Sequence, residues 1–201
     1  MVFRSSAEKK QSTSAKCAGV NMNIFYLDED VEECAKMHVD KHVVKMILEY
    51  SQLLSTAHRV LDGDESTQKS FTGRNVKRYT LSGERESKLY VATHINHPSA
   101  VWVRKSAGNY YWLTKLLLEL CKEYTYRYGK VHKCERDGLV KMLYERWPDN
   151  MSVILFTEPT PAMPDEFIVD GDSIKSYRNY YLGSKTRMFS WKNREVPYWI
   201  A

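Results

Sequence analysis

The chain has 201 residues, 43% of them hydrophobic and 27% charged, which is enough for one globular domain with a real core. Its net charge is +5, and residues 1–21 carry +3 of that, so a protein that is basic throughout is excluded and any basic surface must be local. No apolar run approaches the roughly 20 residues of a membrane-spanning helix, and the N-terminus lacks the apolar segment of a secretory signal.

The first 21 residues offer little to bury, because they are rich in Ser, Lys and Gln. We expect residues 1–21 to form a disordered basic tail. An upstream extension is the alternative, since Met22-Asn23-Ile24-Phe25 looks like a natural start. Residues 22–201 are expected to form a single, mainly α-helical domain with long loops and at most a minor strand element. Residues 23–27 are one candidate for a short strand or an extended segment.

A short helix is expected over residues 31–37, and a longer one follows from Val39 to Leu61. The longer helix places one apolar residue after another on a single face at a period of 3.6. That face consists of Val43, Met46, Ile47, Tyr50, Leu53, Leu54, Ala57 and Leu61. The opposite side gathers Lys41, Lys45, Glu49 and Gln52, with Asp40 and His42 near its edges.

The charged side of this helix has two interpretations. Lys41 and Lys45 are helical neighbours and repel each other unless an anion lies between them. They could clamp a phosphate, or one of them could act as an amine nucleophile that forms a Schiff base. Glu49 could then move a proton or stabilise positive charge on a sugar ring. A solvated surface with structural ion pairs is the other interpretation.

Residues 62–88 form a polar, basic segment with interleaved aromatic residues, and we expect a long loop there. Its notable members are Lys69, Phe71, Arg74, Lys77, Arg78, Tyr79 and Arg85. Basic and aromatic residues together suit a strand of nucleic acid, and a mobile insertion is the alternative.

Further helices are predicted after this loop. Pro98 opens one, which leaves His94, Asn96 and His97 in the loop before it. Others are expected over residues 107–128 and 134–147, and from Ile174 to Leu182 with Ser173 as the cap. Between them, residues 151–156 form an apolar run, expected as a strand or a buried segment. Residues 158–164 are irregular because of their prolines, and the aromatic C-terminus is expected to dock on the core.

Histidine and arginine residues offer further candidate sites. The pairs His38/His42 and His94/His97, with Asp40 or Glu49, could hold a divalent metal if they come together. His94 and His97 could instead meet an anion at the helix that follows. Glu123 and Arg127 can form an ion pair that is either structural or holds a site in place.

The aromatic segment Tyr177-Arg178-Asn179-Tyr180-Tyr181 could stack on an extruded base through Tyr177 and Arg178. Packing in an aromatic core, with the arginine reaching solvent, is the alternative.

Four sequence segments resemble a group of small bacteriophage proteins described as pyrimidine dimer DNA glycosylase-like, the endonuclease V type of repair enzyme. They are Met22 to Phe25, Asp40 to Glu49, Thr93 to Pro98, and Glu123-Tyr124 with Arg127. The resemblance runs from Met22 nearly to the end. It implies an all-helical enzyme that flips a nucleotide out of DNA, cuts the glycosidic bond and cleaves the backbone at the abasic site.

The repair enzyme uses the α-amine of an N-terminal threonine as its nucleophile, with a glutamate and basic residues beside it. This sequence has Asn23 after Met22 and no threonine there, so the amine is expected from Lys41 or Lys45. By role, Glu49 matches the glutamate, while His94 and His97 would bind phosphate or transfer protons. Asp40, His42, Asn96, Arg127, Tyr177 and Arg178 would line the nucleic-acid surface.

The expected function is therefore that of a phage DNA-processing enzyme, glycosylase/AP-lyase-like, that acts on a base or abasic site in damaged or single-stranded DNA without a cofactor. A metal-dependent nuclease or hydrolase built on the histidine pairs is one alternative. A non-enzymatic protein that binds nucleic acid or nucleotides is another. Four cysteines without C-x-x-C spacing favour the cytoplasm, here that of the infected bacterial cell.

Overall fold

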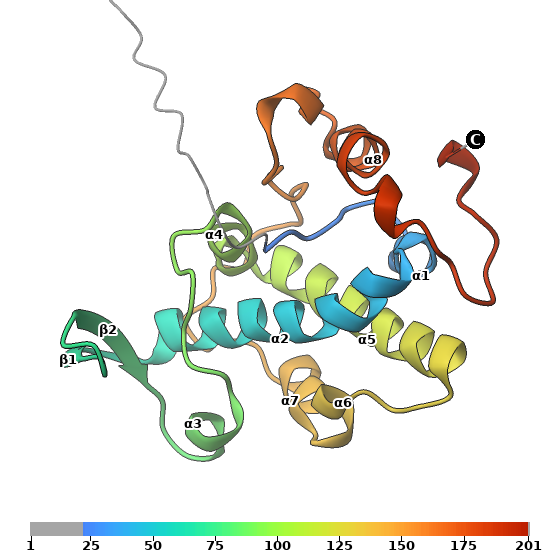
Figure 1. Ribbon diagram of the computed structural model, residues 1–201. Helices are drawn as coiled ribbons and strands as arrows, with labels where there is room; N and C mark the ends of the chain where they lie inside the picture. The colour runs from blue at the N-terminus through green and yellow to red at the C-terminus, as the bar shows by residue number, and fades with distance from the viewer. Residues whose placement is uncertain (1–21, 201) are drawn as a thin grey trace, which may run out of the picture.

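The computed structural model describes residues 22–200, and these are mainly α-helical, as the sequence predicts (Figure 1). The expected tail of residues 1–21 lies outside the described part. The helices are α1 (Val31–Met37), α2 (Asp40–Asp62), α3 (Glu84–Lys88), α4 (Pro98–Lys105), α5 (Ala107–Tyr128), α6 (Lys133–Arg136), α7 (Leu139–Glu145) and α8 (Ser173–Ser184). Short 3-10 turns occupy Asp165–Phe167, Thr186–Met188 and Tyr198–Ile200. The strands β1 (Asp64–Lys69) and β2 (Asn75–Thr80) form one antiparallel hairpin.

Helix α2 lies at the centre of the fold and crosses α5, while α4 and α7 pack beside it (Figure 1). Its predicted apolar face is completely buried from Val43 to Ala57, and Leu61 is half-buried. Burying one such aliphatic side chain stabilises the fold by about 1.5–3 kcal/mol. From Glu49 onward the polar side of α2 is also covered. Ser51 and Ser55 satisfy their hydroxyls by donating to carbonyls four residues earlier.

Residues 22–28 form an extended, largely buried segment that has no strand partner within residues 22–200. Side chains from three helices donate hydrogen bonds to its carbonyls. Tyr50 of α2 donates to Ile24, Ser99 of α4 to Met22, and Arg178 of α8 to Leu27. The segment therefore joins α2, α4 and α8, and the expectation of an extended segment is confirmed.

Three predicted elements differ in the structure. The helix expected over residues 134–147 is divided into α6 and α7, because Gly138 adopts a left-handed conformation with φ +79°. The cap of α8 is Asp172, whose carboxylate accepts the Lys175 amide, in place of Ser173. The apolar run at residues 151–156 is neither a strand nor buried, apart from Met151.

Residues 152–156 run across the start of α5 instead. The Ala107 amide donates to the Ser152 carbonyl at 2.9 Å, and the Gly108 amide donates to the Ile154 carbonyl at 3.2 Å. A Cβ atom on Gly108 would lie 2.3 Å from the Phe156 nitrogen. Only glycine allows the two backbones to approach this closely.

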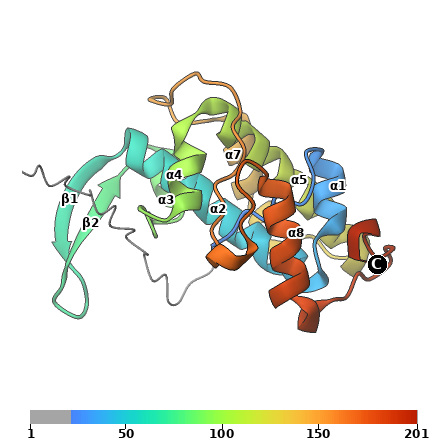
Figure 2. The same cartoon turned by 90° about the horizontal axis from the view of Figure 1, so that it is seen from above.

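Residues 62–88 are more ordered than the loop we expected. The β1–β2 hairpin follows directly on α2 and projects from the body, and α3 comes after it (Figure 2). Asp64 pairs with Thr80 at the base, and Lys69 pairs with Asn75 at the far end.

The aromatic C-terminus docks on the core, as predicted. Trp191 is buried and donates to the Met37 carbonyl at 2.9 Å, while the Trp199 indole lies against the Met37 sulfur. Among residues 22–200, none of the helices combines the length and apolar character that a membrane crossing needs.

Candidate functional site

Lys45 and Glu49 form an ion pair on α2, at a distance of 2.7 Å between Nζ and Oε1. The two side chains differ in exposure: 57% for Lys45 and 8% for Glu49. The second carboxylate oxygen, Oε2, is buried and has no hydrogen-bond partner among residues 22–200. Buried polar atoms in folded proteins almost always have partners, so this oxygen needs an explanation.

Burial raises the pKa of Glu49 above its usual value of 4.5. The hydrogen bond and charge of Lys45, and then the charge of His94, oppose the shift without cancelling it. Glu49 therefore takes up a proton at a higher pH than a solvated glutamate does. An upward shift is the direction expected of a glutamate that carries a proton in a reaction.

The loop before α4 places His94 over the Glu49 face of α2. The Thr93 amide donates to Thr56 Oγ1 at 3.2 Å, and Thr56 lies seven residues after Glu49, on the same helix face. His94 is exposed and has φ +49°, an uncommon left-handed conformation for a residue other than glycine. Backbone outliers of this kind cluster at functional sites.

His97 caps α4 by accepting the Ser99 amide at Nδ1, over 3.2 Å. Burial lowers its pKa, and the charge of His94 lowers it further. His97 is therefore a neutral capping residue next to His94, and the predicted loop position of both histidines is confirmed.

Asn23 lies at the seam between α2 and α4. The carbonyls on either side of it, those of Met22 and Ile24, accept from Ser99 of α4 and Tyr50 of α2. Its own amide is fully buried, and neither the oxygen nor the nitrogen has a partner among the described residues. Within residues 22–200, four buried side-chain atoms lack a hydrogen-bond partner, and three of them belong to Asn23 and Glu49.

We call the Lys45–Glu49 pair, together with His94 and His97 in the loop before α4, the Glu49 site. Asn23, on the extended segment next to α2, is another residue whose buried side-chain atoms have no partner among residues 22–200. Sequence reasoning missed Asn23, although a polar residue inside the apolar run Met22 to Leu27 was a usable signal.

A basic face borders the Glu49 site. Lys41 lies one turn before Lys45, is exposed, and takes part in none of the ion pairs found within residues 22–200. Lys185, just after α8, lies close enough for its charge to act on His42. Burial lowers the pKa of His42 to about 2, and His38, Lys185 and Lys45 add to that shift. Lys41, Lys45 and Lys185 thus gather positive charge on one side of the molecule.

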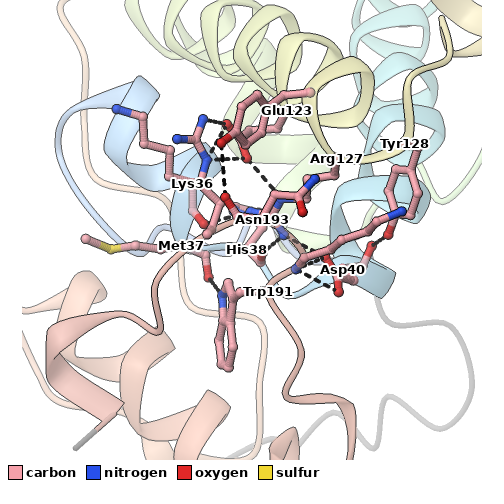
Figure 3. Close-up of polar contacts among 12 residues, drawn as sticks. Lys36, Met37, His38, Asp40, Glu123, Arg127, Tyr128, Trp191 and Asn193 are labelled. Carbon is pink, nitrogen blue, oxygen red and sulfur yellow. Dashed lines mark hydrogen bonds and ion pairs between the residues drawn. The ribbon is translucent and has the colours of Figure 1, made fainter.

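Arg127 was predicted to bind nucleic acid, and the structure corrects this. Its guanidinium is completely buried and donates to the Lys36 and His38 carbonyls, to Asp40 and to Glu123 (Figure 3). Four of its five N–H groups donate within the protein and the side chain is 0% exposed, so a phosphate cannot reach it and Arg127 is structural.

The Asp40 carboxylate likewise forms its hydrogen bonds within the protein. Its carboxylate accepts from the Ser190 hydroxyl, the Lys192 amide and Arg127. Burial by itself would raise the pKa of Asp40, but these hydrogen bonds and the Arg127 charge lower it overall. We call this set the Asp40–Arg127 network: Asp40, Glu123, Arg127, Ser190 and Lys192.

The predicted nucleic-acid contacts of His42, Tyr177 and Arg178 are also corrected. His42 is buried, stacks on Phe25 and shares a 2.6 Å hydrogen bond with the Tyr181 hydroxyl. Tyr177 is fully buried, so it cannot stack on a base. Arg178 is half-buried and bonds to the Leu27 carbonyl and to Asp28. Asn96 is exposed and remains a candidate contact residue.

The two histidine pairs do not form one ligand set. The His38 ring donates to the Cys34 carbonyl and contacts the Tyr50 hydroxyl. Within residues 22–200, no three His, Cys, Asp or Glu side chains are placed to share a metal ion. The geometry therefore gives no support to the alternative of a metal-dependent hydrolase.

Comparison with models of protein families, with curated proteins and with solved structures gave no match. What this chain does must therefore be argued from the Glu49 site and its surroundings.

Proposed function

We propose that the chain is a phage DNA-processing enzyme of the glycosylase/AP-lyase type, acting on a base or an abasic site in the infected cell's cytoplasm. One observation carries the proposal: a buried glutamate has one oxygen on an exposed amine and the other oxygen without a partner. An amine and a proton carrier in contact are the two groups that Schiff-base chemistry at a sugar aldehyde requires.

The reaction can be written on these residues. Glu49 takes a proton from Lys45 across their 2.7 Å contact, which leaves a neutral amine. The amine attacks C1′ of the open abasic sugar, and the carbonyl oxygen leaves as water after it takes one proton from the amine nitrogen and one from Glu49. The resulting iminium acidifies C2′, a base removes that proton, and the 3′ phosphate leaves. Water then hydrolyses the iminium and regenerates Lys45.

The surroundings of the pair supply the remaining roles. His94 is exposed above the same face of α2 and can take the C2′ proton. Lys41, exposed one turn before Lys45, would neutralise a phosphate beside the abasic sugar, and Lys185 would bind a second one.

Borohydride trapping on DNA tests the proposal, because it reduces the iminium to a stable amine bond. The panel contains duplexes with an abasic site, a thymine dimer or uracil, and an undamaged duplex. We expect a covalent adduct with abasic DNA that is lost in Lys45→Ala and strongly reduced in Glu49→Gln. An adduct with the dimer or uracil duplex would add a glycosylase step.

Lys122→Ala is the matched control, since Lys122 also pairs with a glutamate of its own helix at 2.7 Å. It should trap like the wild type. Trapping that survives in both Lys45→Ala and Lys41→Ala would show that neither lysine is the nucleophile. DNA binding by folded wild-type protein without any adduct would favour the non-enzymatic alternative.

A further inference from the structure

The β1–β2 hairpin has no role in the Glu49 site, yet its composition is unusual. It projects beyond the end of α2, and every residue of β1 is exposed (Figure 2). In β2 only Tyr79, near the base, is buried. An isolated two-stranded hairpin is marginally stable at best, so an exposed ribbon of this kind contributes little to the stability of the domain.

Charge is distributed unevenly along the hairpin. Its two acids, Asp64 and Glu65, lie at the base, next to α2. Residues 66–78 contain no acid and carry four basic residues: Lys69, Arg74, Lys77 and Arg78. Lys77 reaches back to Glu65 at 2.7 Å, and the other three take part in none of the ion pairs found within residues 22–200. The outer part of the ribbon is therefore a strongly positive projection.

The turn at the end of the hairpin carries an exposed aromatic ring. Phe71 has a relative exposure of 107%, so it contacts almost nothing in the protein. The turn is nevertheless well defined. The Gly73 amide donates to the Ser70 carbonyl, the Ser70 amide donates to the Arg74 carbonyl, and Gly73 supplies φ +77°. A defined turn that presents a phenylalanine between Lys69 and Arg74 suits a partner that combines anionic and flat apolar surfaces.

We propose that the hairpin is a second DNA contact, a β-ribbon that enters the major groove of the duplex on which the Glu49 site acts. The major groove is about 12 Å wide and admits a two-stranded ribbon. Lys69, Arg74 and Arg78 bind the phosphates that border the groove, and Phe71 packs against base edges and thymine methyl groups. The inference rests on the proposed function, and it adds the path of the DNA duplex across the protein surface.

The dimensions agree with one duplex that spans both contacts. From Glu49 to the end of α2 the helix rises about 20 Å. The six-residue strands add about 20 Å more. The hairpin bends away from the α2 axis (Figure 2), so the straight distance from Glu49 to Phe71 is below the sum of about 40 Å. One turn of B-DNA is about 34–36 Å, so a duplex that passes the Glu49 site can reach the hairpin within about one helical turn.

Binding to duplexes of two lengths tests the inference. Each carries a stable abasic analogue at the same distance from one end, and the lengths are one and three helical turns. We expect wild type to bind the longer duplex at least about tenfold more tightly. Lys69→Ala/Arg74→Ala should lose most of that advantage, with a salt slope lower by about 2, and should bind the short duplex normally. Phe71→Ala should lose part of the advantage with no change in the salt slope.

Lys122→Ala/Lys141→Ala removes the same charge from exposed sites elsewhere and should keep the length dependence. Each variant should melt like the wild type, because the hairpin tip contacts no core residue. The inference is overturned if the hairpin variant matches this control on the long duplex, or if it weakens both lengths equally. In either case, a borohydride adduct retained on a short duplex with a true, aldehyde-bearing abasic site would leave the proposed function standing, and a missing adduct would remove both.

Discussion

The Asp40–Arg127 network and the Glu49 site share a sequence pattern but differ in how many of their buried polar atoms have hydrogen-bond partners. Each contains an acid and a base four residues apart on one helix: Glu123 with Arg127 on α5, and Lys45 with Glu49 on α2. In the network the Arg127 guanidinium donates to four groups, and Asp40 accepts from three. At Glu49 one oxygen has a partner and the other has none among residues 22–200.

The difference shows that spacing alone does not separate a structural pair from a candidate site. Both pairs satisfy the helical rule for neighbouring charges. Burial combined with an incomplete set of hydrogen bonds separates them, because a buried polar atom without a partner costs stability and persists where function requires it. Four predictions test this contrast, in order of falling effect.

Arg127→Ala should have the largest effect on stability. It leaves Glu123, Asp40 and two carbonyls without their shared donor, and the loss of one partner from a buried ion pair costs about 3–5 kcal/mol. Denaturant unfolding measures the change, and Arg127→Lys should fall between the two proteins because it keeps the charge and loses the fork. A loss below about 1 kcal/mol would mean that the network is not structural.

Glu49→Gln should cost the reaction about 100- to 10,000-fold in rate while the fold keeps its stability. The pKa of Glu49 is raised in the folded state, so its ionised form lowers the free energy of unfolding increasingly as pH rises above 4.5. The neutral amide removes that penalty, so the variant should melt no lower than wild type at pH 7. Trapping yield and thermal melting provide the two measurements. A large fall in melting temperature would place Glu49 with the structural charges.

Asp40→Asn should destabilise the fold by about 1.5–3 kcal/mol at neutral pH, the typical worth of hydrogen bonds to a charged group. The pKa of Asp40 is lowered in the folded state, so its contribution is present above its usual value of 3.8 and disappears as pH falls through the folded value. Unfolding curves from pH 7 downward should therefore show wild type and variant converging below about pH 4. A constant difference across this range would contradict the role given to the Asp40 charge.

Lys122→Ala should change stability by less than about 1 kcal/mol, because exposed ion pairs contribute little. Lys45→Ala leaves the buried Glu49 carboxylate without a partner on either oxygen among residues 22–200 and should cost about 1–3 kcal/mol. Only Lys45→Ala should lose borohydride trapping. Equal trapping by the two variants would show that the Lys45–Glu49 pair is an ordinary surface pair.

The sequence predicted most of the helices well, because local patterns determine them. The residues of α1 and α5 were predicted with their observed bounds, and α2 within one residue. The prediction of one helix over residues 134–147 was wrong. The apolar pattern continues through Gly138, but the left-handed conformation of this residue interrupts the helix. The prediction of a strand or a buried segment at residues 151–156 was also wrong. Their exposure depends on the close approach to Gly108, a contact between segments distant in the sequence.

The candidate site could be predicted only in part. The helical period placed Lys45 and Glu49 together, and Pro98 placed His94 in the loop before α4. The burial of Arg127, Tyr177 and His42 depends on residues more than 80 positions away, so local spacing could not reveal it. Predicting the position of Asn23 required the same long-range information, because its backbone lies between α2 and α4 only in the folded protein.

The contact between Asp40 and Ser190 also has a consequence for the order of synthesis. The two residues are 150 positions apart, and Ser190 and Lys192 complete the hydrogen bonds of Asp40 at the first turn of α2. Because a ribosome makes the N-terminal part first, the turn that carries Lys41 waits for the last part of the chain before it is fully held. A nascent or prematurely stopped chain would thus present the lysine face of α2 without its anchor.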